Sequence, residues 1–205
     1  MGCDIHMFTE ALRSVNDKPT WVNVDNWRVN PYYKEGNEDG ERPYDVQELH
    51  GRRNYTLFTV LAGVRSDDDD NKPVADPRGF PEDASPQTTA EYKRWEGDGH
   101  THSWLTLQEL IDHQAKNPTI TYTGMLTPEQ AKELDENGTE PEYWCGWTSN
   151  QDAVQRTWTV ENNTLVPLIE KLKERMRDEF WIFNKEDDYD KELHNKMRIV
   201  FWFDN

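Results

Sequence analysis

Cysteine is scarce in this chain, since only Cys3 and Cys145 occur among its 205 residues. Two cysteines are too few for the disulfide framework of a small secreted protein, so we expect a reducing, cytoplasmic compartment. A single bridge between the two stays open as an alternative. Long apolar runs are lacking as well: Asp4 and His6 interrupt the first residues, and no later run approaches the length of a bilayer-spanning helix. The sequence therefore predicts neither a signal peptide nor a membrane partner.

Positive charge and aliphatic side chains are also in short supply. The chain has 23 Lys and Arg against 40 Asp and Glu, a formal net charge of -17. A field of that sign repels polyanions, so we expect no duplex nucleic acid and no anionic membrane among the partners, although a local arginine pocket for a small anion is compatible with it. The hydrophobic fraction is 34 % and the mean hydropathy is -1.04, which favours disorder. The 9 Trp, 8 Tyr and 7 Phe act in the other direction, and we predict a folded chain with long polar loops.

The order of the predicted elements indicates an α+β fold. Two β-prone runs around Asn16 and Asp17 predict a hairpin over residues 5–24. Asn54 and Gly63 fit the cap positions of a short helix, and a capping box at Thr106 precedes another helix. Further helical patterns lie at 88–95, 127–138 and 164–183, strand patterns at 120–126, 156–160 and 198–205, and patternless polar stretches at 26–51 and 66–86. We expect a small antiparallel or mixed sheet that includes the N-terminal hairpin and the C-terminal strand, with helices packed on it, in a single domain spanning residues 1–205.

Two polar clusters carry the strongest chemical signal. Asp4 and His6 share one face of the first predicted strand. Far along the chain, Gly-Asp-Gly-His-Thr-His places Asp98, His100 and His102 within five positions. Two side chains spaced by two on a strand can both turn toward one ion, and imidazole with carboxylate suits zinc, manganese or iron. We therefore expect a divalent metal, zinc or manganese, held by Asp4, His6, His100 and His102. Asp98 and His100 are the expected catalytic residues, with Asp98 serving as a metal ligand or as the general base.

Other interpretations of the histidines stay open. The paired histidines can serve a metal-free acid–base site, or they can be purely structural. Glu10 lies on the same predicted strand face as His6, where it could orient a ligand histidine. The remaining histidines, His50, His113 and His194, lie singly in polar or helical segments, and we expect them on the surface.

A group of arginines forms the second candidate site. Four of them lie around or after the short predicted helix: Arg52, Arg53, Arg65 and Arg78. In so acidic a chain they would form a pocket for a small anionic ligand such as a nucleotide. Asn54 and Tyr55 would add hydrogen bonds, and Trp104 would stack at the edge of the site. The alternative is that the arginines pair with neighbouring acids, including the four aspartates at 67–70, a run that fits a solvated surface better than a calcium loop.

Neither cysteine is predicted to be catalytic. Cys3 and His6 do not share a strand face, so we expect Cys3 to be a small buried residue rather than an activated thiolate. Cys145 lies within Tyr-Trp-Cys-Gly-Trp, and we expect it to belong to an aromatic packing cluster.

Two resemblances bear on these motifs. Asp-x-His at the N-terminus and Gly-His-Thr-His resemble the first and last metal-ligand motifs of calcineurin-like metallophosphoesterases, whereas the Gly-Asp-x-x-Asp and Gly-Asn-His motifs of that family do not occur here. The chain as a whole resembles a family of uncharacterised bacteriophage and bacterial proteins that begin Met-Gly-Cys-Asp-Ile-His. The shared motifs lie at residues 1–6, 53–58, 62–65, 77–81, 98–103 and 201–205. This resemblance implies a phage or prophage origin, and hence the cytoplasm of a host cell, but no established activity.

Three functional hypotheses follow from these observations. The first is a small phage-type metal-dependent hydrolase of a phosphoester or nucleotide, such as a host nucleotide signal. In it the ion lowers the pKa of a bound water, and Arg53 and Arg65 hold the anionic substrate. The second is a non-enzymatic protein that sequesters a nucleotide through the same arginines and tryptophans. The third is an acidic inhibitor of a host protein, which would occupy that protein's nucleic-acid groove. The sequence leaves the oligomeric state open.

Overall fold

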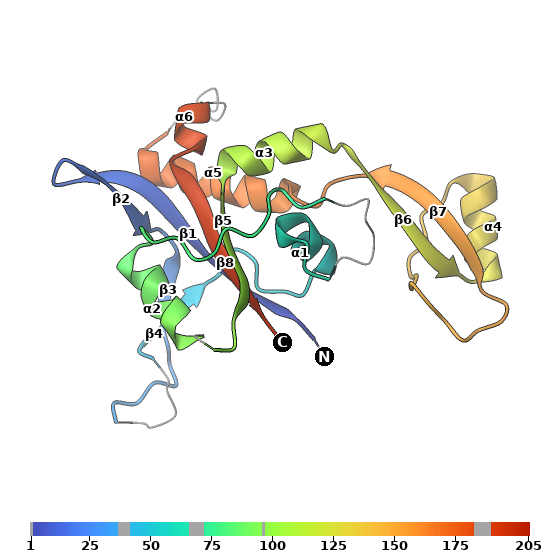
Figure 1. Ribbon diagram of the computed structural model, residues 1–205, viewed down its shortest axis with the longest axis horizontal. Helices are drawn as coiled ribbons and strands as arrows, with labels where there is room; N and C mark the ends of the chain where they lie inside the picture. Colours follow the sequence, from blue (N-terminus) through green and yellow to red (C-terminus); the bar gives the residue numbers. More distant parts are fainter. Residues whose placement is uncertain (1, 37–41, 66–71, 96, 183–189) are drawn as a thin grey trace.

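The computed structural model describes residues 2–36, 42–65, 72–95, 97–182 and 190–205. Within these ranges the protein has the predicted α+β fold, with antiparallel strand pairs (Figure 1). The strands are β1 (Asp4–Val15), β2 (Lys18–Asn23), β3 (Asn26–Val29), β4 (Tyr44–Gln47), β5 (His100–Thr106), β6 (Thr119–Leu126), β7 (Val154–Glu161) and β8 (Met197–Asp204). The helices are α1 (Tyr55–Ala62), α2 (Pro86–Arg94), α3 (Leu107–Lys116), α4 (Pro128–Asn137), α5 (Val166–Phe180) and α6 (Lys191–His194).

The main sheet has four strands in the order β2-β1-β8-β5. β8 lies inside it, and its residues from Met197 to Phe203 are all buried, which explains why this strand reads as a nearly continuous apolar run. β1 and β8 pair with Asp4 opposite Asp204, so the first and last strands lie side by side. The prediction that the N-terminal hairpin and the C-terminal strand belong to one sheet is confirmed.

The β1–β2 hairpin is formed by the chemistry of its turn. Asn16 and Asp17 have φ angles of 51° and 62°, both in the left-handed region, between Val15 and its partner Lys18. Two consecutive residues with positive φ make a type I′ turn, whose twist matches that of the flanking strands. Asn and Asp enter this region more readily than other residues with a side chain, so the turn position follows directly from the sequence.

The two faces of the main sheet have different roles. One face carries Ile5, Met7, Phe201 and Phe203, which pack with residues of α1, α3 and α5 in the main hydrophobic core. Side chains of directly paired residues point to the same side. The opposite face therefore carries Asp4, His6, Phe8 and Glu10 of β1 next to Asp204, Trp202, Val200 and Arg198 of β8. Rings from α2 and from the segment before it cover part of this second face, since Tyr92 and Phe80 both contact Trp202.

A separate unit, called the arm here (residues 119–161), consists of β6, α4, β7 and the loop between α4 and β7. It projects from the rest of the molecule in Figure 1 and has its own small core of Leu126, Ala131 and Trp158. The two ends of the arm meet beside the buried Asn162. The backbone N–H of Asn162 donates to the Pro118 carbonyl at 2.9 Å, and its side-chain amide donates to the Asn117 carbonyl at 3.0 Å. The arm is thus an insertion attached where α3 ends.

Two expectations about local structure are wrong. Residues 26–51 were expected to have no regular structure, yet they contain the β3–β4 hairpin, with Trp27 paired to Val46 and Arg28 to Asp45. Each of these strands is only four residues long, too short to display a periodic pattern. His194, expected on the surface, is buried at the end of α6, and its Nδ1 lies 3.0 Å from Oε1 of Gln108. Within the described ranges, no helix combines the length and the apolarity needed to cross a membrane.

Candidate functional site

His6 occupies the centre of the polar face of the sheet. Its ring lies 4.0 Å from that of Trp95 and 5.8 Å from that of Trp202, centroid to centroid. Its Nε2 lies 3.3 Å from Oδ2 of Asp204, and its Nδ1 lies 3.9 Å from Oε1 of Glu48. Burial alone would lower the pKa of His6, but the two carboxylates outweigh it, and the pKa is raised above its usual value of 6.5. His6 therefore lies against two indoles, with an acid near each ring nitrogen, and both acids favour its protonated form.

Asp4, the other residue of the N-terminal pair, forms an ion pair with Arg53. Its carboxylate accepts two hydrogen bonds from Arg53, at 2.6 Å from Nε and 2.7 Å from Nη2. This bidentate contact lowers the pKa of Asp4. Both side chains are about half exposed, so the pair lies on the surface at the end of the sheet.

The His-x-His pair is divided by an irregularity in β5. The register against β8 shifts between His100 and Ser103, and Thr101 has a φ of 53°. His100 stacks on Phe203 at 6.0 Å, whereas His102 lies 6.2 Å from Trp202. Phe203 and Trp202 are consecutive in β8 and point to opposite faces, so the two histidines contact different faces of the sheet. The β-bulge thus cancels the alternation that would place both rings on one side.

The two predicted halves of the metal site lie on the same sheet, on either side of β8. His6 and His102 both contact Trp202, so this indole lies between the β1 and β5 histidines. Asp98 is exposed in the turn before β5, where its N–H donates to the Trp95 carbonyl at 3.0 Å. Among the described residues, no three His, Cys, Asp or Glu side chains are close enough together to hold a metal ion.

The β5 histidines nevertheless have ring nitrogens available to a ligand. The Nε2 atoms of His100 and His102 are buried, and neither has a hydrogen-bond partner among the described residues. Burial and the neighbouring His100 together lower the pKa of His102, which favours its neutral ring. A neutral imidazole with a bare nitrogen can accept a proton or bind a metal.

The predicted arginine site lies where the two ends of the chain meet. Arg53 contacts Asp4, and Nη2 of Arg65 lies 3.3 Å from the side-chain oxygen of Asn205. Asn54 caps α1 by accepting from the Leu57 N–H at 3.1 Å, and the Tyr55 ring lies 5.9 Å from the Arg65 guanidinium. The structure therefore brings Arg53, Asn54, Tyr55 and Arg65 together, with protein partners already in place. The aspartates at 67–70, proposed as alternative partners, lie outside the described residues.

Trp104 and Glu10 belong to a buried ionic network instead of the histidine site. The Glu10 carboxylate accepts from Nε of Arg198 at 2.9 Å and from the Ser85 N–H at 2.7 Å, so it has no contact with a histidine ligand, contrary to our expectation. Trp104 lies near two guanidinium groups, 4.6 Å from that of Arg78 and 5.6 Å from that of Arg198. Arg78 in turn pairs with Glu109 and is not part of the arginine group around α1.

The two cysteines lie in different environments. Cys3 is buried, as expected, and burial is the main cause that raises the pKa of its thiol. Cys145 is exposed on the arm, and its backbone rather than its side chain supports the neighbouring aromatic rings. Both thiols are free in the structure, and no disulfide joins them.

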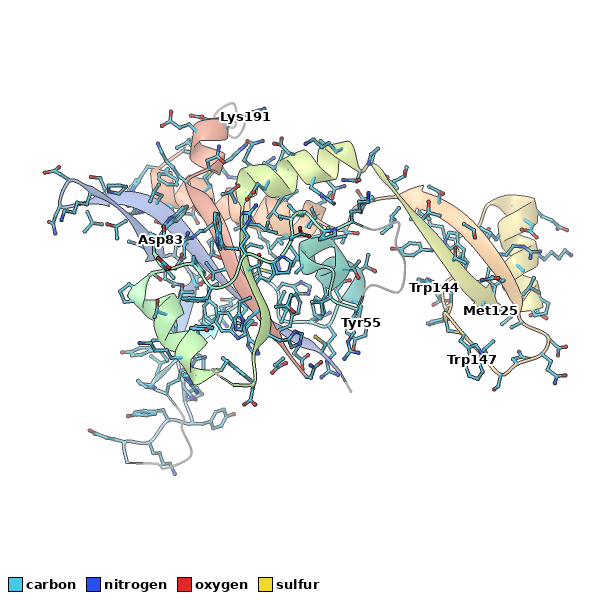
Figure 2. All side chains as sticks on the ribbon, viewed as in Figure 1. Tyr55, Asp83, Met125, Trp144, Trp147 and Lys191 are labelled. Carbon is cyan, nitrogen blue, oxygen red and sulfur yellow. The ribbon has the colours of Figure 1, made fainter. Side chains whose placement is uncertain are left out.

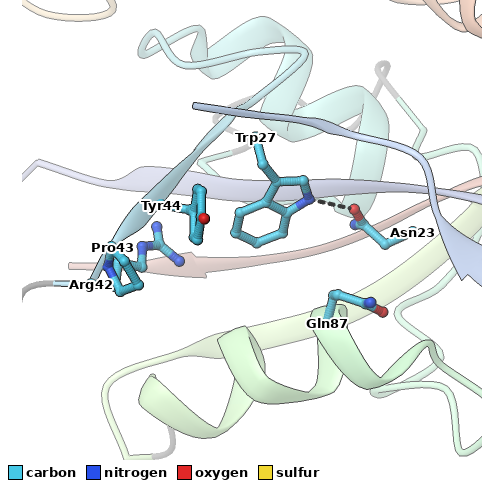
Figure 3. Close-up of a pocket in the computed structure, with 6 residues that line it drawn as sticks. All are labelled: Asn23, Trp27, Arg42, Pro43, Tyr44 and Gln87. Carbon is cyan, nitrogen blue, oxygen red and sulfur yellow. Dashed lines mark hydrogen bonds between the residues drawn. The ribbon is translucent and has the colours of Figure 1, made fainter. Parts of the chain in front are cut away.

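A pocket that the sequence reasoning missed lies between the β3–β4 hairpin and α2 (Figure 3). It has a volume of about 550 Å³ and is lined by Asn23, Trp27, Arg42, Pro43, Tyr44 and Gln87. Trp27 and Tyr44 lie on one face of the hairpin, since Trp27 pairs with Val46, two residues after Tyr44. The sequence signal for this hairpin was the alternation of polar and apolar residues in Asn-Trp-Arg-Val and Tyr-Asp-Val-Gln. It spans only four residues in each strand.

Comparison with known proteins gives no further assignment. No protein-family model, no curated protein sequence and no solved structure matches this chain.

Proposed function

We propose that this protein binds a nucleoside or nucleotide through its base, in the pocket between the β3–β4 hairpin and α2. The observation that carries the proposal is an open pocket of about 550 Å³ with the rings of Trp27 and Tyr44 on one side and Gln87 of α2 on the other (Figure 3). This volume is in the range of small-molecule sites. Bases stack on aromatic side chains, which contributes about 1–3 kcal/mol for each base.

The polar groups of the pocket fit the edge of a base. The Gln87 amide offers a donor and an acceptor, and no hydrogen bond joins it to another described residue. The orientation of Trp27 is fixed by its Nε1–H, which donates to Oδ1 of Asn23 at 2.9 Å. A base that enters between the hairpin and α2 would therefore meet an aromatic surface that is already ordered, at little entropic cost.

The charge of the pocket indicates that the base, and not the phosphate, supplies most of the affinity. Arg42 lies 5.8 Å from the Trp27 ring, and it pairs with Glu91 and Asp45. Two acids largely compensate its charge, so a phosphate gains little from it. This corresponds to the hypothesis of a non-enzymatic, nucleotide-sequestering protein, with a different set of residues from the arginines around α1.

Titration calorimetry with the four ribonucleosides and their 5′-monophosphates tests this function. We expect saturable binding of at least one base, with a nucleoside and its monophosphate differing by less than about tenfold in Kd. Trp27→Ala should weaken binding about tenfold or more. Trp147→Ala, which removes an exposed indole from the arm, is the matched control and should leave the Kd unchanged. The proposal would be abandoned if no base binds, or if both variants behave alike.

A metal-dependent hydrolase remains a second proposal, favoured by one observation. The buried Nε2 atoms of His100 and His102 lack partners in the described part of the chain, as metal-ligating nitrogens would in a metal-free protein. Because the two rings contact different faces of the sheet, one ion can be held by both only after the backbone at Thr101 rearranges. Zinc or manganese held in that way would supply an acidic water for phosphoester hydrolysis, with Asp98 as the proposed base. Asp4 and His6, the other expected ligands, have Arg53, Glu48 and Asp204 as partners.

Elemental analysis of protein purified without chelator separates this second proposal from the first. Stoichiometric zinc or manganese that is lost in both His100→Ala and His102→Ala, and retained in His113→Ala, would support it. A protein that contains no metal, and whose thermal midpoint does not change on addition of Zn²⁺ or Mn²⁺, would refute it.

A further inference from the structure

Three aromatic side chains are exposed together in the loop of the arm between α4 and β7. Tyr143 is 72 % exposed, Trp144 44 % and Trp147 80 %. Figure 2 shows Trp144 and Trp147 on this part of the arm. Tyrosine and tryptophan are the residues that most often carry the binding energy of protein interfaces, and grouped exposure of this kind marks interaction surfaces. These three residues are called the aromatic tip below.

The aromatic tip is held in place by the strand beside it. The Met125 N–H of β6 donates to the Cys145 carbonyl at 2.8 Å, and the Gln130 side chain donates to the Tyr143 carbonyl at 2.9 Å. The Trp144 ring lies directly over Gly124, where a Cβ atom would be only 2.8 Å from the indole. Because the backbone on one side of Trp147 is fixed in this way, less conformational entropy is lost when its ring is buried by a partner.

The charge of the arm defines the kind of partner. Residues 119–161 contain eight acidic and two basic side chains, a formal charge of -6. Both basic residues pair within the arm, Lys132 with Glu136 and Arg156 with Asp135. Glu140 and Glu142 lie immediately before the aromatic tip in the sequence. The surface thus combines aromatic rings with uncompensated negative charge.

We propose that the aromatic tip is a docking surface for a protein with clustered arginine or lysine side chains. Guanidinium and ammonium groups stack favourably on indole and phenol rings, and the acidic arm would steer such a partner toward the tip. A second copy of this chain is disfavoured, since two arms of charge -6 would repel each other. The same repulsion disfavours nucleic acid. This surface is separate from the pocket beside Trp27, so the two proposals stand or fall independently.

The test uses the full chain and a defined probe, a fifteen-residue peptide of alternating arginine and glycine, with a citrulline-for-arginine peptide as its neutral counterpart. A fluorophore on Cys145, the exposed cysteine two positions before Trp147, reports docking at the tip. We expect saturable binding of the arginine peptide that weakens with salt, and no binding of the citrulline peptide. Trp147→Ala should weaken binding at least tenfold, whereas Trp27→Ala should not change it.

A charge-matched pair of variants separates the local acids from the overall charge. The double substitution Glu140→Gln with Glu142→Gln should weaken binding severalfold more than Glu170→Gln with Glu192→Gln, which removes two exposed acids from α5 and α6. The proposal would be overturned if the two double variants weakened peptide binding equally, or if Trp147→Ala and Trp27→Ala did so. A concentration-dependent mass in sedimentation that Trp147→Ala abolishes would also overturn it, because the tip would then bind a second copy of this chain.

Discussion

Nε2 of His6 lies 3.3 Å from Oδ2 of Asp204, a contact between residues 198 positions apart that joins the first strand to the last. Glu48 approaches the other ring nitrogen at 3.9 Å from the side of the β3–β4 hairpin. Three separate segments therefore meet at one imidazole. The protonated ring can satisfy both carboxylates at once, and the neutral ring, with a single N–H, can donate to only one of them.

We predict that His6 and His102 titrate on opposite sides of pH 6.5, although both contact Trp202. The pKa of His6 is raised by Glu48 and Asp204 against the effect of burial, and that of His102 is lowered by burial and by His100. Ring-proton chemical shifts followed by NMR from pH 5 to pH 9 would measure both. His6→Gln and His102→Gln spectra would assign the two signals.

The raised pKa of His6 also has a consequence for stability. A group whose folded pKa exceeds its unfolded pKa contributes stability that is complete below the unfolded value and is lost as pH rises through the folded value. We therefore expect His6→Gln to lower the free energy of unfolding, measured in urea, more at pH 5.5 than at pH 9. A cost that does not vary with pH would show that the carboxylates do not stabilise the imidazolium.

Removing one partner of the buried ion pair between Glu10 and Arg198 should strongly destabilise the protein. Both side chains are almost fully buried, with Nη2 of Arg198 2.8 Å from Oε2 of Glu10. Arg198→Met would leave Glu10 without its counterion, and we expect a loss of about 3–5 kcal/mol in the free energy of unfolding. The double variant Arg198→Met with Glu10→Leu should recover part of this loss. Arg13→Met, which breaks the more exposed pair with Glu179, is the control and should cost less than about 1 kcal/mol.

Asp25 should make the protein less stable above about pH 6 than it is near pH 4. Burial raises the pKa of this carboxyl group to about 6, although the Thr9 N–H donates to it at 2.9 Å. Because the folded pKa lies above the unfolded one, the stabilising effect is complete below about pH 4 and is lost as pH rises through about 6. Urea unfolding of the natural protein and of Asp25→Asn between pH 4.5 and 8 measures it. The variant should gain about 2 kcal/mol relative to the natural protein across this range, and parallel curves would contradict the prediction.

Asp17→Gly should stabilise the protein. Asp17 has a φ of 62° in the β1–β2 turn, a conformation that costs a residue with a side chain but not glycine, and Asn-Gly is the preferred type I′ pair. We expect a gain of about 0.5–1 kcal/mol and an increase in the thermal midpoint. Asp17→Val, which cannot adopt this conformation without strain, should have the opposite effect.

Local chemistry made much of the fold predictable. The Asn16-Asp17 turn, the Asn54 and Gly63 caps of α1 and the Thr106 capping box of α3 all depend on residues that are close in the sequence. The apolar run of β8 likewise follows from its burial inside the sheet. The β3–β4 hairpin was missed because each strand is four residues long and only half of each is apolar.

The geometry of the candidate sites depends on contacts that are distant in the sequence, and these were not predictable. The face occupied by Asp4 and His6 follows from strand alternation, but the partners Arg53, Glu48 and Asp204 come from other segments. The spacing of His100 and His102 suggested one side of a strand, and the bulge at Thr101 assigns them to two. The pocket beside Trp27 depends on α2 lying across the hairpin, which no motif in either segment encodes.

The attachment of the arm beside Asn162 has a consequence for how the sequence of this protein can change. Pro118 and Asn162 are joined by a backbone hydrogen bond, so the ends of the inserted segment are already adjacent. Residues 119–161 could be shortened, lengthened or exchanged for a tight turn without changing the register of any strand in the main sheet. Sequence change can therefore accumulate in the arm, including the proposed docking surface, while the pocket and the sheet keep their geometry.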